Sequence, residues 1–136
     1  MPFAVWNDRL SVGVDAIDED HKKLIAMIND LYDAILAGRE RKKLDNLLDR
    51  LVDYTRYHFA REEKLLARTG YPDVAAHKHA HSDMAAWIKT ASRRYHNSSA
   101  MAPSLEAINH LTDWFYNHIL SYDQKFAPHL KAHRIP

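Results

Sequence analysis

The chain has 136 residues, and its 19 lysines and arginines against 18 aspartates and glutamates leave a formal net charge of +1. This length indicates one domain, and the balanced charge gives no support for a nucleic-acid or anionic-membrane partner. The absence of cysteine excludes disulfides, thiolate metal sites and a cysteine nucleophile. No apolar run is long enough for membrane insertion and the first residues lack a signal-peptide pattern, so we expect a cytoplasmic protein.

Glycine and proline divide the chain into four stretches with helical periodicity. Each stretch carries an apolar seam of heptad-like spacing, which is typical of helices packed side by side. The sequence therefore predicts an all-α fold, namely an up-down-up-down antiparallel four-helix bundle in a single domain over 1–136. The expected helices span about 18–37, 41–68, 73–96 and 104–126.

The ends of these elements carry their own signals. Asp18, Asp73 and Ser104 are the expected N-caps of the first, third and fourth helices. We expect an N-terminal arm over 1–16, held against the bundle by Trp6 and Val12. The bundle would then cover about 17–127, and Pro128 would end the last helix and begin a short C-terminal tail.

Six polar side chains occupy seam positions where apolar residues belong; these are His21, His58, Glu62, His77, His81 and His118. Burying one unpaired polar group costs on the order of a few kcal/mol, whereas a whole domain is stable by only about 5–15 kcal/mol. A bound metal would satisfy all six together. His58 and Glu62 are four residues apart, as are His77 and His81, so each pair projects from one helical face.

Asp123 is a further candidate ligand, five residues after His118. In an ideal helix this spacing places the two side chains about 140° apart. Asp123 would therefore need a local distortion of the helix, or a sideways reach, to join the others.

A single seam histidine is more often a hydrogen-bonded core residue than a ligand, but two such pairs plus seam histidines on two other helices are hard to explain by core packing. Five imidazoles and two carboxylates are too many donors for one ion and suit two, with one position left open. Nitrogen and oxygen donors favour iron, manganese, zinc or copper over calcium or magnesium. The other five histidines lie off the seams and are expected on the solvated surface: His79, His96, His110, His129 and His133.

The segments that carry these residues resemble the hemerythrin family, and in particular its single-domain bacterial branch. The similarity runs from Trp6 to about Phe126 and is carried by four segments: Ile17–Leu24, His58–Glu63, His77–His81 and Trp114–Asp123. It differs from ferritin-type di-iron bundles, whose Glu-x-x-His repeats are absent from this sequence.

The resemblance implies a cofactor of two iron ions joined by an oxo or hydroxo bridge. One ion would be held by His77, His81 and His118. The other would be held by His21 and His58, with an open position at which dioxygen binds, and Glu62 and Asp123 would bridge both ions.

Apolar residues near these ligands are expected to form the dioxygen pocket: Leu24, Phe59, Trp114, Phe115 and Ile119. An apolar wall would keep water and protons away from the bound gas. For Leu24 and Phe115, ordinary core packing explains the residue type equally well.

The expected function is reversible dioxygen binding by a monomer, for carriage, storage or delivery to an oxygen-consuming enzyme, rather than catalysis. An oxygen or redox sensor is one alternative; because little precedes Trp6 or follows Pro136, it would need a separate signalling partner. A di-iron peroxidase or nitric-oxide-handling enzyme is a second, and iron storage is a third. Fast autoxidation would indicate a sensor or enzyme, and more than two irons per chain would indicate storage.

Overall fold

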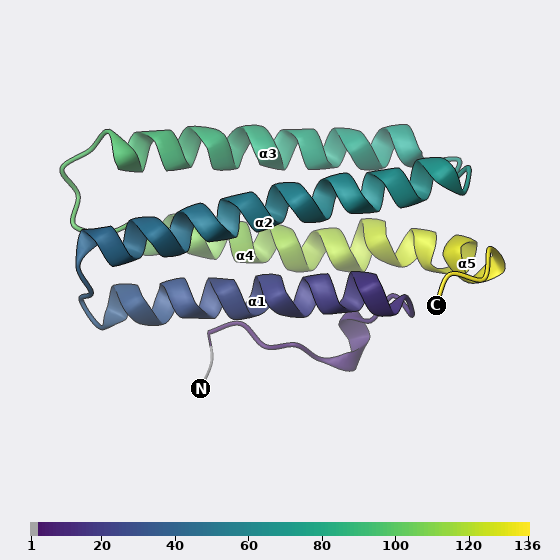
Figure 1. The fold of residues 1–136 in the computed structure, drawn as a ribbon, viewed down its shortest axis with the longest axis horizontal. Helices are drawn as coiled ribbons and strands as arrows, with labels where there is room; N and C mark the ends of the chain where they lie inside the picture. Colours follow the sequence, from purple (N-terminus) through teal and green to yellow (C-terminus); the bar gives the residue numbers. More distant parts are fainter. Residues whose placement is uncertain (1–2) are drawn as a thin grey trace.

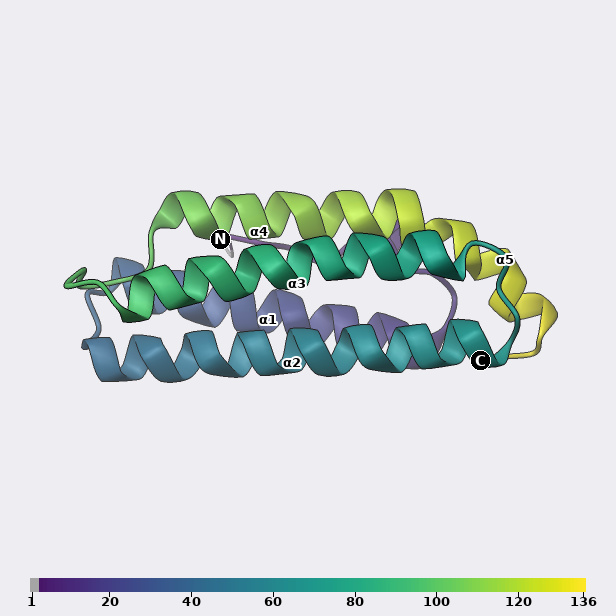
Figure 2. The same cartoon turned by 90° about the horizontal axis from the view of Figure 1, so that it is seen from above.

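The computed structural model describes residues 3–136, which form helices and no strand. Figures 1 and 2 show four long helices that run antiparallel to their neighbours, with the N-terminal segment lying along the outside of the bundle. The elements are η1 (Asp8–Leu10), α1 (Asp15–Leu36), α2 (Arg41–Arg68), α3 (Val74–His96), α4 (Leu105–His118), the π-helical turn η2 (Ile119–Asp123) and α5 (Gln124–Ala132). The predicted all-α, up-down-up-down four-helix bundle is therefore confirmed.

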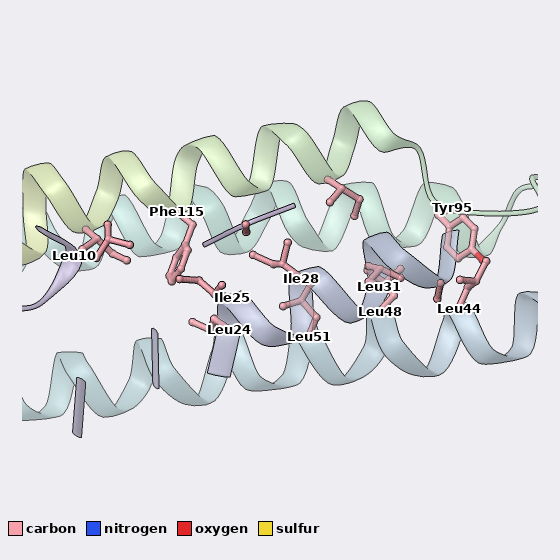
Figure 3. Close-up of a cluster of buried hydrophobic side chains, with 14 residues drawn as sticks. Leu10, Leu24, Ile25, Ile28, Leu31, Leu44, Leu48, Leu51, Tyr95 and Phe115 are labelled. Carbon is pink, nitrogen blue, oxygen red and sulfur yellow. The ribbon is translucent and has the colours of Figure 1, made fainter. Parts of the chain in front are cut away.

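The predicted seams meet in a core that follows the length of the bundle. Figure 3 shows side chains of α1, α2 and α4 directed toward one another, with Phe115 of α4 reaching toward Leu24 and Ile25 of α1. Full burial of a side chain of this size contributes about 1.5–3 kcal/mol. No helix in the described part of the chain combines the length and the apolar character that crossing a membrane requires.

The first helix begins earlier than predicted, and Asp18 is not its N-cap. Val14 occupies the cap position and makes no capping hydrogen bond through its side chain. Asp18 lies inside α1, where its carboxylate accepts hydrogen bonds from the Ser11 hydroxyl at 2.6 Å and the Val12 N–H at 2.9 Å. The prediction was wrong because the acidic side chain binds the arm instead of the free N–H groups of the helix.

The other two predicted caps differ from each other. Asp73 occupies the N-cap position of α3, but its side chain makes no capping hydrogen bond. The Ser104 hydroxyl accepts a hydrogen bond from the Ala107 N–H at 2.9 Å, so Ser104 caps α4 as predicted.

The N-terminal arm packs against the bundle through the two residues expected, and a pair of hydrogen bonds also holds it there. Val12 is buried, and Trp6 is partly buried against the main core cluster. The Asn29 side chain of α1 accepts from the Ala4 N–H and donates to the Ala4 carbonyl, each at 2.7 Å. This reciprocal pair fixes the arm across α1.

The last helix continues past Pro128 to Ala132, so the prediction that it ends at about 126 was wrong. A proline inside a helix removes one hydrogen bond and costs about 3 kcal/mol. Phe126 and Leu130 are both fully buried on either side of it, and this burial outweighs the cost. The chain end also returns to α1, where the Asp15 N–H donates to the Pro136 carbonyl at 3.0 Å.

Candidate metal centre

The seven predicted ligand side chains come together at one level of the bundle. The antiparallel order brings the first turns of α1 and α3 beside the later parts of α2 and α4 (Figure 1). All seven are at most 5% exposed, although each carries a polar group. Two overlapping groups could each hold an ion, one of His21, His58 and Glu62, and one of Glu62, His77, His81 and His118.

Glu62 lies between the two groups and directs one oxygen to each. Its Oε1 contacts the Nε2 of His77 and lies 3.2 Å from the Nε2 of His81. Its Oε2 lies 3.1 Å from the Nε2 of His58 and 3.8 Å from that of His21. A carboxylate in this position can bridge two ions.

Asp123 repeats the same division from the opposite side of the bundle. Its Oδ1 lies 3.3 Å from the Nε2 of His77 and 3.2 Å from that of His118. Its Oδ2 lies 3.2 Å from the Nε2 of His21. Taken together, the contacts of the two carboxylates divide the five histidines into a group of three and a group of two.

A π-helical turn brings Asp123 to the site. Within η2 the Gln124 N–H donates to the carbonyl of Ile119, five residues earlier, as a π-helix requires. The wider turn aligns residues that are five apart, so His118 and Asp123 face the same cluster. This is the local distortion that the sequence required without identifying it.

The metal-free cluster retains protons on two of its imidazoles. Burial lowers the pKa of His58, but the charge of Glu62 and hydrogen bonds to Asp20 and Glu62 raise it to about 10. Burial likewise lowers the pKa of His77, while hydrogen bonds to Asp123 and Glu62 raise it to about 9. A metal ion would have to displace these protons.

The two buried carboxyl groups remain charged. Burial raises the pKa of Glu62, but the charge of His58 and hydrogen bonds to the imidazoles hold it well below the ordinary value. Burial and the charge of Glu62 raise the pKa of Asp123, yet its hydrogen bonds to His118, His21 and His77 lower it overall. Burial is the main cause that lowers the pKa of His118.

The donor atoms fit a pair of cations. The Nδ1–H of His58 donates to Asp20 at 3.0 Å and that of His81 donates to Glu63 at 2.9 Å, so that Nε2 is the nitrogen that each ring would offer to a metal ion. These Nε2 atoms lie 3.1 Å from the Nε2 atoms of His21 and His118, respectively. Oε2 of Glu62 and both carboxylate oxygens of Asp123 are buried and face imidazole nitrogens at 3.1–3.8 Å, but none of these contacts is a well-aligned hydrogen bond. Imidazole and carboxylate donors of this kind suit a pair of iron ions.

The sequence reasoning missed two carboxylates behind the cluster, Asp20 and Glu63. Asp20 directly precedes His21, and Glu63 directly follows Glu62. Asp20 is only 2% exposed. An acidic residue directly beside a predicted ligand was the available signal, but a neighbouring position on a helix usually faces solvent.

Three of the five predicted pocket residues belong to one buried cluster, and one of these, Phe115, contacts the two-histidine group. The Phe115 ring meets the His21 ring edge-on, with centroids 5.4 Å apart. Leu24, Phe115 and Ile119 belong to one buried apolar cluster, and Figure 3 shows the first two close together.

The other two pocket residues lie on the three-histidine side. Phe59 stacks on His81 with centroids 4.0 Å apart, and Trp114 stacks on His118 at 4.5 Å. Phe59 and Trp114 also touch edge to face at 5.9 Å. These aromatic rings cover His81 of α3 and His118 of α4.

Four of the histidines expected on the surface are exposed, namely His79, His96, His110 and His133. His129 is an exception because it is only partly exposed. Its Nε2–H donates to the Thr69 carbonyl at 3.0 Å, and its ring lies 5.2 Å from that of Tyr71. His129 therefore connects α5 to the end of α2, instead of lying free on the solvated surface as expected.

Comparison with known proteins decides the family. Residues 12–130 match the family model described as the hemerythrin HHE cation binding domain. The chain belongs to the hemerythrin family. All seven clustered side chains lie inside the range that matches this hemerythrin model, and the resemblance predicted from the sequence is confirmed.

Individual hemerythrins resemble the chain along most of its length. The bacteriohemerythrin of Stenotrophomonas maltophilia (strain R551-3) is 36% identical over 133 residues, which cover 98% of this chain and 85% of the relative. The bacteriohemerythrin of Methylococcus capsulatus (strain ATCC 33009 / NCIMB 11132 / Bath) is 32% identical over 133 residues, covering 97% and 100%. The crystal structure of a wild-type hemerythrin superposes with a TM-score of 0.87 at 29% identity, covering 94% of this chain and 98% of that one.

Proposed function

We propose that this chain binds dioxygen reversibly at a centre of two iron ions. One geometric feature carries the proposal: Glu62 and Asp123 each direct one oxygen to a group of three histidines and the other to a group of two. In this assignment His77, His81 and His118 hold one ion. His21 and His58 hold the other, and the smaller number of protein donors leaves a position open there.

When bound, the reduced iron pair supplies the electrons that hold dioxygen. The protein's own contribution is to exclude water from the open position. Leu24 and Ile119 are at most 3% exposed, and the edge of Phe115 covers the His21 ring. An apolar surrounding of this kind limits proton access and so favours release of dioxygen unchanged.

The physiological role that we propose is carriage, storage or delivery of dioxygen to an oxygen-consuming enzyme, by a monomer in the cytoplasm. The lifetime of the oxygenated protein tests this role. A carrier holds its dioxygen for minutes or longer, whereas a sensor or redox enzyme would pass quickly to the oxidised form.

The deciding experiment is an anaerobic optical titration. The reduced protein is assayed for iron per chain and then exposed to air while its absorption spectrum is followed. We expect two irons, a nearly colourless reduced form, and a visible band that appears with air and disappears on degassing. Direct and irreversible passage to the oxidised form would contradict reversible binding.

The ligand assignment is tested by a matched pair of histidine variants in α3. His77→Ala should lose iron and stability together, because the ion and its neighbours lose a shared partner. His79→Ala removes an exposed imidazole two residues away and should retain two irons. Full iron content in His77→Ala would show that the ligand set is wrong.

A further inference from the structure

A buried carboxylate behind the centre gathers three hydrogen-bond donors. Oδ2 of Asp20 accepts from the Nδ1–H of His58 at 3.0 Å. Oδ1 of Asp20 accepts from the Tyr54 hydroxyl at 2.8 Å and from the Arg61 guanidinium at 3.3 Å. Asp20 belongs to α1 and its three partners belong to α2, so this cluster also joins the two helices that carry the two-histidine group.

The two histidines of that group are supported differently. The Nδ1 of His58 is fixed by Asp20, whereas the Nδ1 of His21 is buried without a hydrogen-bond partner. The orientation and tautomer of His58 are therefore set by a carboxylate that is itself held in place. In the three-histidine group the corresponding carboxylate is Glu63, which accepts from His81 and whose side chain is 26% exposed.

We propose that Asp20 is a positioning residue that selectively strengthens the ion on the His21 and His58 side. By accepting the Nδ1–H, Asp20 keeps the proton on that nitrogen, aims the Nε2 lone pair at the ion and makes Nε2 more basic. Removing such a partner typically weakens metal binding about 10- to 100-fold. The inference rests on the proposed two-ion centre, but not on its reaction with dioxygen.

Replacement by asparagine removes this support with little change in shape. An amide offers one acceptor oxygen and one donor nitrogen, whereas the Asp20 carboxylate accepts on both oxygens. In either orientation the negative charge is lost and the amide nitrogen replaces one acceptor oxygen, so His58 either loses its acceptor or keeps only a neutral one. Tyr54→Phe is the matched control, because it deletes one donor and leaves the Asp20–His58 hydrogen bond intact.

The test measures metal binding and not oxygen chemistry. Metal-free protein is titrated anaerobically with ferrous ions against a chelator of known affinity. For Asp20→Asn we expect one ion with wild-type affinity and one weakened about 10- to 100-fold, whereas Tyr54→Phe should bind both ions as the wild type does. Unchanged affinity for both ions, or equal weakening of both, would overturn the inference.

Proton NMR on the wild-type protein, which measures how fast the imidazole N–H protons exchange with solvent, gives a second readout that does not depend on whether the variant folds. In the diferrous form, the imidazole N–H of His58 should exchange with solvent much more slowly than that of His21. Equally fast exchange at the two rings would overturn the inference. If the chain binds two ferrous ions but no dioxygen, the proposed function fails while the role of Asp20 can still be decided.

Discussion

Iron binding to the metal-free protein should strengthen steeply as the pH rises. The pKa values of about 10 for His58 and about 9 for His77 mean that both rings are almost fully protonated at neutral pH. A ring that binds iron through Nε2 must release that proton, whereas Glu62 and Asp123 are already charged. Loading should therefore release about two protons per chain from these rings, besides any that water releases on becoming a bridge, and the logarithm of the overall binding constant should rise by at least about two per pH unit between about pH 6 and 8.

Proton release can be counted by anaerobic titration calorimetry with ferrous ions in two buffers of different ionisation enthalpy. We expect at least about two protons per chain at neutral pH, and the same number for His79→Ala, whose imidazole is exposed. Release of fewer than one proton, or an affinity independent of pH across this interval, would refute the reasoning. Either result would mean that the buried carboxylates do not hold protons on His58 and His77.

Three further predictions concern the aromatic shield, the caps and the core. Trp114→Ala should retain both irons but shorten the lifetime of the oxygenated protein, because it uncovers the face of His118. The lifetime is measured as the optical decay of the oxygenated form, and the control Trp87→Ala, whose ring lies against His110, should leave it unchanged. By chemical denaturation, Ser104→Ala should cost about 1 kcal/mol, whereas Asp73→Ala, which removes no capping bond, should cost much less. Leu31→Ala, at a fully buried position, should cost about 2–5 kcal/mol with unchanged iron content.

The helices and the polar cluster could be predicted because burial is recorded in sequence spacing. A helical seam identifies the residues that face the interior, so polar residues on the seam, such as His58 and Glu62, had to meet in the bundle. The family resemblance then divided them between two ions. Asp123 was only a weak candidate from its spacing, since the period of a regular helix placed it on another face, and the resemblance then supported it as a ligand.

The remaining features depend on tertiary contacts that spacing does not record. Asp18 has the residue type of a helix cap, but Ser11 and Val12 of the arm compete for its carboxylate. Pro128 carries a strong signal for a helix end, which the burial of Leu130 overrides. Asp20 lies outside the apolar seam, and its burial follows from how closely α1 and α2 approach.

The π-helical turn divides the helical segment from Leu105 to Ala132 into two parts, and the inward-facing side of the second part is rotated about the helix axis relative to that of the first. Before it, Phe115 and His118 face inward; Asp123 at its end does so too, followed by Phe126 and Leu130. Deleting one residue from 119–123 would restore regular α-helical bonding but rotate everything that follows by about 100°. That single deletion would withdraw a carboxylate from the centre and expose the apolar anchors of the last helix. The same turn therefore sets both the position of the Asp123 carboxylate and the burial of the C-terminal helix, so this one deletion would disturb the metal centre and the helix packing together.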